Sequence, residues 1–363
     1  MRIGIPRERK PMEGRVALVP EACGDLVRDG HEVLVESGAG EASGYPDAAY
    51  EAAGARLVPD AAALYGAAEL VVKVKEPVEE DLHHLRRGHL LFCFLHLAAM
   101  PELAERLRAI GLTALGFETV AVDGRLPLLA PMSQVAGRIA VQVGSTLLHL
   151  PQGGRGLLLG GLPGTERGHV VVLGAGTVGG AAAAMAAAMG ALVTVFDRKP
   201  ERLEAMRALG PNVTALYPYR DAVAAAVREA DLLVGAVLVP ARRTPHLVSE
   251  AMVRTMRPGS VIADVSVDQG GCVETTRPTD WERPTYVEHG VVHFAVTNMP
   301  GAVPRSATQA LSAALLPWVR RLARPDWRDD PALAGAVNVA GGKIVHPALR
   351  EELAAAPAAA GSA

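Results

Sequence analysis

Short apolar runs alternate with amphipathic stretches along the first 130 residues of the chain. The apolar runs predict strands, and the stretches between them carry apolar residues at helical spacing. The expected strands are residues 2–5, 31–35, 70–74, 90–95 and 113–117, and the expected helices between them include 20–28, 79–86 and 101–109. This alternation is typical of a parallel sheet that is covered by helices on both faces.

A second region of the same kind lies between residues 169 and 197. A strand is expected at 169–173, and the sequence Gly174-Ala175-Gly176-Thr177-Val178-Gly179 follows it directly. An alanine-rich helix is expected at 180–189, and a second strand, 191–196, ends at Asp197. Strand, glycine-rich turn, helix, strand and distal acid together indicate a dinucleotide-binding unit.

The three glycines of this turn have separate physical roles. Gly174 permits the tight turn out of the strand, and Gly176 has no Cβ, so that a pyrophosphate can approach the backbone. Gly179 allows close packing of the helix on the strand. The phosphates would then lie at the free N–H groups of the helix N-terminus. A strand–helix turn without a ligand is the alternative interpretation.

The acid at the end of the second strand indicates which dinucleotide binds. A carboxylate at Asp197 would accept hydrogen bonds from both adenosine ribose hydroxyls and repel a 2′-phosphate, so we expect NAD rather than NADP. Arg198 and Lys199 act in the opposite direction, because basic residues here can accommodate a 2′-phosphate. Ser133 is either a further phosphate ligand or the N-cap of a helix expected at 135–150.

The order of the elements predicts two domains. Strands at 231–237 and 260–265 continue the nucleotide-binding sheet, and the chain becomes helical again at 306–322. We therefore expect an NAD-binding domain at 131–299, inserted into a discontinuous substrate domain that comprises 1–130 and 300–363. The predicted fold class is α/β, with two doubly wound, Rossmann-like parallel sheets.

Composition limits the partners and the compartment. The chain of 363 residues has no uninterrupted apolar stretch of membrane-spanning length, and its first residues have the pattern of a strand rather than of a signal peptide. The net charge of −3 does not indicate a basic surface that would bind nucleic acid. The three isolated cysteines fit a reducing cytoplasm and argue against a zinc site, so no metal is expected.

Four side chains with useful chemistry follow expected strands. Arg15 lies in the loop after the first strand, Lys75 and His96 close two later apolar runs, and Asp268 follows a fourth. Since ligands bind beyond the carboxyl ends of parallel strands, one cleft could gather these groups beside a nicotinamide.

Each of these side chains also has a structural interpretation. Arg15 could be a solvated loop cation, and Lys73 and Lys75 could protect an edge strand. His96 could be a half-buried histidine without a chemical role, and Asp268 could cap a turn beside a glycine.

At these residues the chain resembles the alanine dehydrogenase family from Met1 to about Leu353. The matching motifs are Gly4-Ile5-Pro6-Arg7-Glu8, Arg15-Val16-Ala17-Leu18-Val19-Pro20, Val74-Lys75-Glu76-Pro77, Phe94-Leu95-His96-Leu97, Met132-Ser133-Gln134-Val135-Ala136-Gly137-Arg138, Asp268-Gln269-Gly270-Gly271 and Asn298-Met299-Pro300-Gly301. The resemblance implies reversible NAD-dependent oxidative deamination of L-alanine to pyruvate and ammonium, by a protein that is typically a homohexamer.

The resemblance also implies roles for individual residues. Arg15 and Lys75 would hold the substrate carboxylate and carbonyl oxygen, and His96 and Asp268 would serve acid–base chemistry. The residues expected to bind the cofactor are Ser133, Gly174, Gly176, Val178, Gly179, Asp197, Arg198, Leu238, Asn298 and Met299. The chain departs from the family at Ala241-Arg242-Arg243, where members usually have Gly, a small residue and Lys.

Three other functions remain possible from the sequence. The nucleotide-binding component of a proton-translocating transhydrogenase resembles this architecture and would dock on a membrane partner. A lysine-forming saccharopine dehydrogenase would take a larger substrate, and a non-catalytic NAD-binding regulator would not need a polar cleft. Lys75, His96 and Asp268 together favour a site for a small amino acid.

Overall fold

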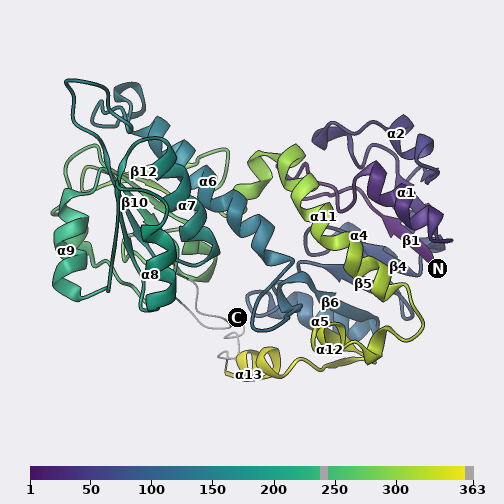
Figure 1. Ribbon diagram of the computed structural model, residues 1–363. Coiled ribbons are helices and arrows are strands. Elements are labelled where there is room, and N and C mark those ends of the chain that lie inside the picture. The colour runs from purple at the N-terminus through teal and green to yellow at the C-terminus, as the bar shows by residue number, and fades with distance from the viewer. Residues whose placement is uncertain (238–243, 356–363) are drawn as a thin grey trace, which may run out of the picture. The chain divides into compact units, whose positions relative to one another are not determined.

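The computed structural model of the protein describes residues 1–237 and 244–355 (Figure 1). The chain forms two compact units, each with its own parallel sheet. Unit 1 comprises Met1–Met132 and the chain from Gly301 onward, and unit 2 is Ser133–Pro300. The boundary falls inside helix α6 (Leu129–Leu147).

Unit 1 contains an eight-stranded sheet in the order β15-β14-β6-β5-β4-β1-β2-β3. Six strands are parallel, and β14 and β15 form an antiparallel hairpin at one edge. The strands are β1 (Arg2–Ile5), β2 (Glu32–Glu36), β3 (Arg56–Val58), β4 (Leu70–Val72), β5 (Leu90–Cys93), β6 (Thr113–Gly116), β14 (Val337–Ala340) and β15 (Lys343–Ile344).

Helices cover both faces of this sheet. One face buries apolar residues of α3, α4 and α5, including Leu64, Leu82 and Leu107, against strand residues such as Leu91. Helix α11 packs with α1. The helices of unit 1 besides the start of α6 are α1 (Pro20–Arg28), α2 (Asp47–Ala52), α3 (Ala61–Ala67), α4 (Glu79–His84), α5 (Pro101–Ile110), α11 (Pro304–Leu322), α12 (Pro331–Gly335) and α13 (Pro347–Ala355).

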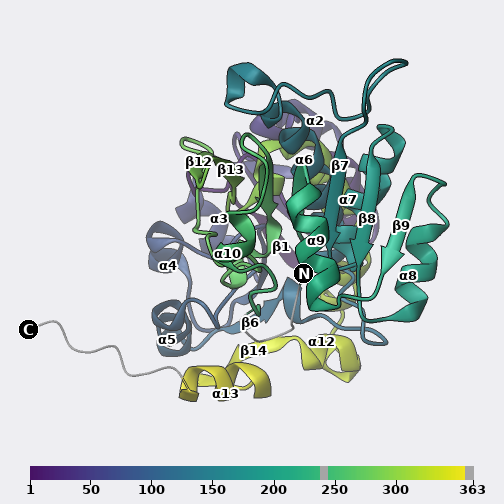
Figure 2. The same ribbon diagram turned by 90° about the vertical axis from the view of Figure 1, so that its left-hand side faces the viewer.

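Unit 2 contains a seven-stranded sheet in the order β12-β13-β11-β10-β7-β8-β9, and all neighbours except β12 and β13 are parallel. Figure 2 shows β7, β8 and β9 side by side. The strands are β7 (His169–Leu173), β8 (Leu192–Phe196), β9 (Val213–Leu216), β10 (Leu232–Gly235), β11 (Val261–Asp264), β12 (Thr285–Glu288) and β13 (Val291–Phe294).

The helices of unit 2 also lie on both faces of its sheet. Helices α7 (Thr177–Ala188) and α8 (Pro200–Arg207) lie on one side of the strands in Figure 1, and α9 (Arg220–Glu229) lies on the other. The short helix α10 (Glu250–Val253) packs with α9. This arrangement confirms the predicted doubly wound α/β fold, which right-handed crossovers produce when the chain reverses direction within a parallel sheet.

Several expected boundaries were wrong, and several strands were not predicted. Helix α6 begins at Leu129, not at residue 135, and β4 and β5 end two residues before the apolar runs do. The unpredicted strands are β3, β9, β12, β13, β14 and β15. They contain two to four residues each.

No helix in the described part of the chain is both long enough and apolar enough to cross a bilayer.

Candidate functional site

The reactive side chains of unit 1 lie beyond the carboxyl ends of adjacent strands. β1 and β4 are neighbours, but the chain leaves β1 towards β2 and leaves β4 towards β5, which makes this a topological switch point. Open α/β sheets bind their ligands at such points. Arg15 lies in the loop after β1, whereas Lys75 and His96 follow the ends of β4 and β5.

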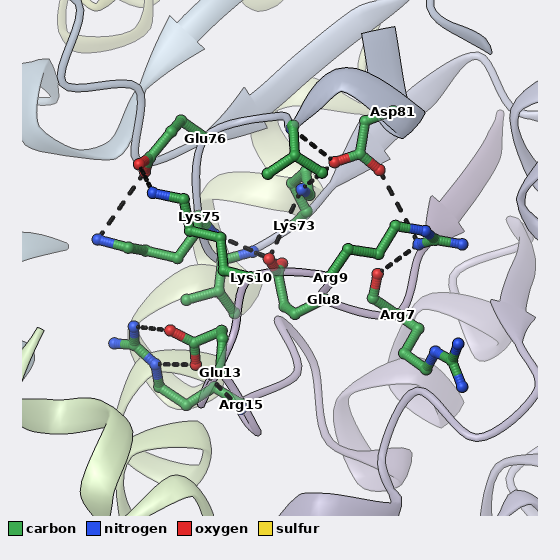
Figure 3. Close-up of polar contacts among 12 residues, drawn as sticks. Arg7, Glu8, Arg9, Lys10, Glu13, Arg15, Lys73, Lys75, Glu76 and Asp81 are labelled. Carbon is green, nitrogen blue, oxygen red and sulfur yellow. Dashed lines mark hydrogen bonds and ion pairs between the residues drawn. The ribbon is translucent and has the colours of Figure 1, made fainter. Parts of the chain in front are cut away.

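A buried carboxylate, that of Glu76, contacts two lysines and His96 (Figure 3 shows the two lysines). The Lys10 ammonium contacts Glu76 Oε1. Lys75 Nζ lies 3.8 Å and His96 Nδ1 lies 3.4 Å from Glu76 Oε2. The site therefore brings Lys75 and His96 together on one carboxylate.

The surroundings of Glu76 favour its ionised form. Burial alone would raise the pKa of this carboxyl, because its side chain is only 4% exposed. The contacts with His96, Lys75 and Lys10 outweigh burial and hold the pKa of Glu76 well below its ordinary value of 4.5. Glu76 is therefore a fixed negative charge at neutral pH.

His96 has an unusual backbone conformation. Its φ of 49° lies in the left-handed region, and its backbone N–H donates to Glu118 Oε1 at 2.7 Å. Its imidazole stacks on Phe94, with ring centroids 5.7 Å apart and an interplanar angle of 23°. The side chain is 39% exposed, so this histidine is open to solvent on one side and held on the other.

Arg15 is buried together with Glu13. The guanidinium donates to both oxygens of Glu13, from Nε at 2.7 Å and from Nη2 at 2.5 Å, and Nη1 lies 3.2 Å from Met132 Sδ. The Arg15 side chain is 2% exposed, so the interpretation as a solvated loop cation is wrong. Two parallel hydrogen bonds fix the plane of the guanidinium fork, and buried pairs of this kind lose about 3–5 kcal/mol when one partner is removed.

The interpretation of Lys73 and Lys75 as protection for an edge strand is also wrong. Strand β4 lies between β5 and β1, inside the sheet, so it has no free edge. Lys73 is buried and donates to Asp81 Oδ2 at 2.7 Å, and Glu8 Oε2 lies 3.6 Å from its Nζ (Figure 3). Lys73 thus neutralises buried acids beneath the site.

Glu8 links this buried network to Lys75. Its Oε1 accepts the backbone N–H of Val74 at 2.6 Å and that of Lys75 at 3.4 Å. Burial raises the pKa of Glu8, and the nearby Lys73 opposes the increase. The backbone that presents Lys75 is therefore held by a carboxylate from the loop after β1.

The acids that organise this site were not predicted to do so. Glu8 and Glu76 lie inside motifs that resemble the alanine dehydrogenase family, but Glu13 and Glu118 lie outside the motifs given above. Nothing in the local pattern distinguishes these four acids from surface acids. Their burial becomes visible only when strands that are distant in sequence lie side by side.

The glycine-rich turn of unit 2 has the geometry that the sequence predicted for a dinucleotide site. Gly174 has a φ of 96°, and a Cβ there would lie 2.7 Å from the carbonyl oxygen of Ala236. A Cβ on Gly179 would lie 1.7 Å from the carbonyl oxygen of Gly174. A Cβ on Gly176 would meet only Arg202 Nη1, at 3.8 Å, so the space beside Gly176 is open at the start of α7. These residues fit a pyrophosphate.

Asp197 follows β8 and is bonded to the same turn. Its carboxylate accepts the N–H of Ala175 at 2.8 Å and that of Lys199 at 2.9 Å, and Arg202 Nη1 lies 3.4 Å away. Burial raises the pKa of Asp197, but these three contacts outweigh it and lower the pKa overall. An ionised acceptor at this position fits the ribose hydroxyls of NAD. Arg198 is exposed.

Asp268 lies in unit 2, in a short 3₁₀ helix (Val265–Gln269), and its side chain is exposed. The apolar run of β11 ends earlier than expected, at Asp264. The buried carboxylate of Asp264 accepts the N–H groups of Ser266, Cys272 and Val273 and so fixes this loop. The structure thus distinguishes two acids that are four residues apart: Asp264 organises the loop, and Asp268 is exposed.

The remaining predicted cofactor residues lie in unit 2. Ser133 lies inside α6, four residues after its first residue, so the interpretation as an N-cap is wrong. Asn298 has a φ of 62° and accepts from Trp281 at its carbonyl, and Met299 is buried. Val178 is the second residue of α7. Leu238 and the departure at Ala241-Arg242-Arg243 lie outside the described residues.

The predicted site residues thus fall into two groups. Arg15, Lys75 and His96 belong to unit 1, whereas Asp268 and all the predicted cofactor residues that the structure describes belong to unit 2. The association of Asp268 with His96 stays a prediction.

Similar proteins share this architecture over almost their whole length. An alanine dehydrogenase from Bacillus subtilis is 47% identical, covering 97% of this chain and 95% of its own. An alanine dehydrogenase from Halomonas elongata is 49% identical, covering 97% and 96%. A solved L-alanine dehydrogenase structure superposes with a TM-score of 0.94 at 50% identity, covering 98% and 99%.

A transhydrogenase structure from Sinorhizobium meliloti is a more distant relative, with a TM-score of 0.83 at 27% identity, covering 96% of this chain and all of its own. Two family profiles match the chain. The one described as alanine dehydrogenase/PNT, N-terminal domain, matches residues 4–136, and the one described as alanine dehydrogenase/PNT, C-terminal domain, matches residues 140–347. The chain therefore belongs to the alanine dehydrogenase/PNT family.

Proposed function

We propose that this protein is an NAD-dependent L-alanine dehydrogenase, an amino-acid dehydrogenase that converts L-alanine reversibly to pyruvate and ammonium. The observation that carries the proposal is the pairing of Lys75 and His96 on the buried Glu76 carboxylate, at the switch point of the unit that also holds Arg15. The near full-length similarity to alanine dehydrogenases supports it.

The side chains of unit 1 suit a small 2-amino or 2-oxo acid. Arg15 would bind the substrate carboxylate through guanidinium N–H groups that Glu13 does not accept, and Lys75 would polarise the oxygen that becomes the pyruvate carbonyl. His96 would accept the proton of the water that replaces the amine, because an imidazole nitrogen can accept a proton and later donate it. Asp268 would order that water or stabilise the protonated imidazole.

The residues of unit 2 suit NAD. The turn from Gly174 to Gly179 would bind the pyrophosphate, and Asp197 would bind the adenosine ribose and disfavour NADP. Ser133, Val178, Arg198, Leu238, Asn298 and Met299 complete the proposed set of contacts. NAD bound to these residues would supply the hydride acceptor, while positioning and proton transfer would belong to the protein.

One assay tests the proposal. NADH oxidation should require pyruvate and ammonium together, and NADPH should replace NADH poorly. Oxidation with pyruvate alone would indicate a hydroxy-acid dehydrogenase, and hydride exchange between nucleotides without pyruvate would indicate a transhydrogenase. Either result contradicts the proposal.

The proposal includes a homohexamer in the cytoplasm. All three cysteines are buried free thiols, as a reducing compartment allows. Light scattering coupled to gel filtration should give six times the 37.9 kDa of the chain. A smaller particle would remove the hexamer from the proposal without affecting the reaction.

A further inference from the structure

We propose that Glu118 is a positioning residue that holds the backbone of His96 in its left-handed conformation and so fixes the imidazole for proton transfer. The role of His96 in proton transfer rests on the proposed function, whereas the effect of Glu118 on the backbone does not. Nothing in the sequence pattern around Glu118 predicts this role.

The carboxylate of Glu118 accepts two consecutive backbone N–H groups. Its Oε1 accepts from His96 at 2.7 Å and from Leu95 at 3.1 Å, and Oε2 lies 3.2 Å from the Leu95 nitrogen. Hydrogen bonds to an ionised acceptor are about twice as strong as those between neutral groups. One side chain thus fixes the peptide groups on both sides of the Leu95 Cα.

These bonds act where the backbone is strained. A left-handed conformation is unfavourable for a residue with a Cβ, and it persists only where surrounding contacts favour it. His96 adopts it with a φ of 49°. The imidazole is held separately, by Glu76 Oε2 at 3.4 Å and by stacking on Phe94.

The fold explains how Glu118 reaches His96. Strands β5 and β6 are parallel neighbours, with Cys93 paired to Gly116. Glu118 and His96 therefore follow adjacent strand ends at nearly the same level. A Cβ on Gly116 would lie 3.1 Å from Glu118 Cδ, so the absence of a side chain there leaves room for the carboxyl group.

The first experiment compares two substitutions of Glu118. Glu118→Leu removes both acceptors, and we expect kcat to fall about 10–100-fold, since a small misplacement of a reacting group can cost 100-fold. KM for pyruvate and the dissociation constant for NADH should change less than about twofold, because the residues proposed to bind them are intact.

The second variant separates hydrogen bonding from charge. Glu118→Gln keeps an oxygen that can accept from both N–H groups, so it should recover most of the turnover lost in Glu118→Leu. A Gln variant as impaired as the Leu variant would overturn the proposal, because charge rather than acceptance of the two N–H groups would then matter. Unchanged kcat in Glu118→Leu would also overturn it.

A stability measurement tests the backbone effect without using activity. His96→Gly and His96→Ala both remove the imidazole but differ in their tolerance of positive φ. With Glu118 present, the unfolding equilibrium constant of the Gly variant should be about fivefold smaller than that of the Ala variant. In the Glu118→Leu background the order should reverse, since glycine is the less stable residue in an ordinary backbone conformation.

The outcomes separate this inference from the proposed function. If the order of the Gly and Ala variants is the same in both backgrounds, Glu118 does not hold the backbone and the inference fails, even for an active alanine dehydrogenase. If the wild-type protein lacks the proposed activity, the stability order of His96→Gly and His96→Ala in the two backgrounds still tests whether Glu118 holds the backbone. Asp60→Asn is the matched control, because Asp60 also accepts a backbone N–H, that of Ala63, but at the start of α3. It should alter stability slightly and kcat not at all.

Discussion

His96 Nδ1 lies 3.4 Å from Glu76 Oε2, and the same buried carboxylate contacts Lys10 and Lys75. Because Glu76 is ionised at neutral pH, a single negative charge holds the ammonium proposed to bind substrate and the imidazole proposed to move a proton. The orientation of both groups therefore depends on the charge of Glu76.

The first prediction concerns Glu76→Gln. The variant loses the ionised partner of Lys10, Lys75 and His96, so its free energy of unfolding at pH 7 should fall by about 3 kcal/mol. The pKa of Glu76 is lowered in the folded protein. Its ionised form therefore contributes fully to the free energy of unfolding above pH 4.5, the ordinary pKa of the group, and this contribution is lost as the pH falls below 4.5. Urea unfolding of both proteins between pH 7 and pH 3 measures this.

The difference in unfolding free energy between the wild type and Glu76→Gln should therefore become smaller only at acidic pH. Glu69→Gln is the control, since the Glu69 side chain is 49% exposed and pairs with Arg2 at the surface. It should cost less than about 1 kcal/mol. A difference for Glu76→Gln that is independent of pH would contradict the prediction.

The second prediction concerns substrate binding. Lys75→Ala and Arg15→Lys should each lower kcat/KM for pyruvate about 100-fold and leave NADH affinity unchanged, because each loses hydrogen bonds to a charged ligand. Arg15→Lys keeps a positive charge beside the buried Glu13. The variant therefore tests the loss of the planar guanidinium without leaving the Glu13 carboxylate unpaired. Lys343→Ala, at an exposed residue of β15, is the control and should have no effect. Wild-type kcat/KM in either variant would remove that residue from the proposed site.

The third prediction concerns cofactor choice. Asp197→Ala should weaken NAD binding by about 1–2 kcal/mol and narrow the preference for NAD over NADP. Asp197→Asn can still accept the N–H of Ala175, so it separates loss of charge from disorder of the glycine turn. Dissociation constants for NAD and NADP measure this preference. Tighter binding of NADP to the wild type would mean that Arg198, Lys199 and Arg202, and not Asp197, determine the cofactor preference.

The fourth prediction concerns proton transfer. His96→Ala should lower kcat about 10²–10⁴-fold, the usual effect of removing a general acid–base group, and should hardly change NADH affinity. Near-normal kcat would mean that His96 is only a histidine packed near a strand end.

The fifth prediction contrasts two acids of one loop. Asp268→Asn should lower kcat about tenfold or more without changing stability, because the exposed side chain keeps its shape but loses its charge. Asp264→Asn should instead lower the unfolding free energy, because the buried Asp264 accepts three backbone N–H groups. If Asp268→Asn destabilises the protein as much as Asp264→Asn does, its proposed role is structural.

The sequence by itself determined the elements whose residues are contiguous. The turn from Gly174 to Gly179 was predictable because its geometry depends on the missing Cβ atoms of three residues close together, and the structure has that geometry. The doubly wound fold was predictable as well, since alternating strands and helices have few ways to bury both faces of a parallel sheet.

Only the tertiary structure decided which charges are buried and paired. Whether Lys73 protects an edge or neutralises a core depends on the position of β4 in the sheet, which pairing with β1 and β5 sets. Glu76, His96 and Glu118 are separated by about twenty residues each along the chain, yet they follow adjacent strands β4, β5 and β6. Side-chain charge and hydrogen bonding act over a few ångströms of space, so the local pattern of residues carries no signal for contacts that the packing of distant strands creates.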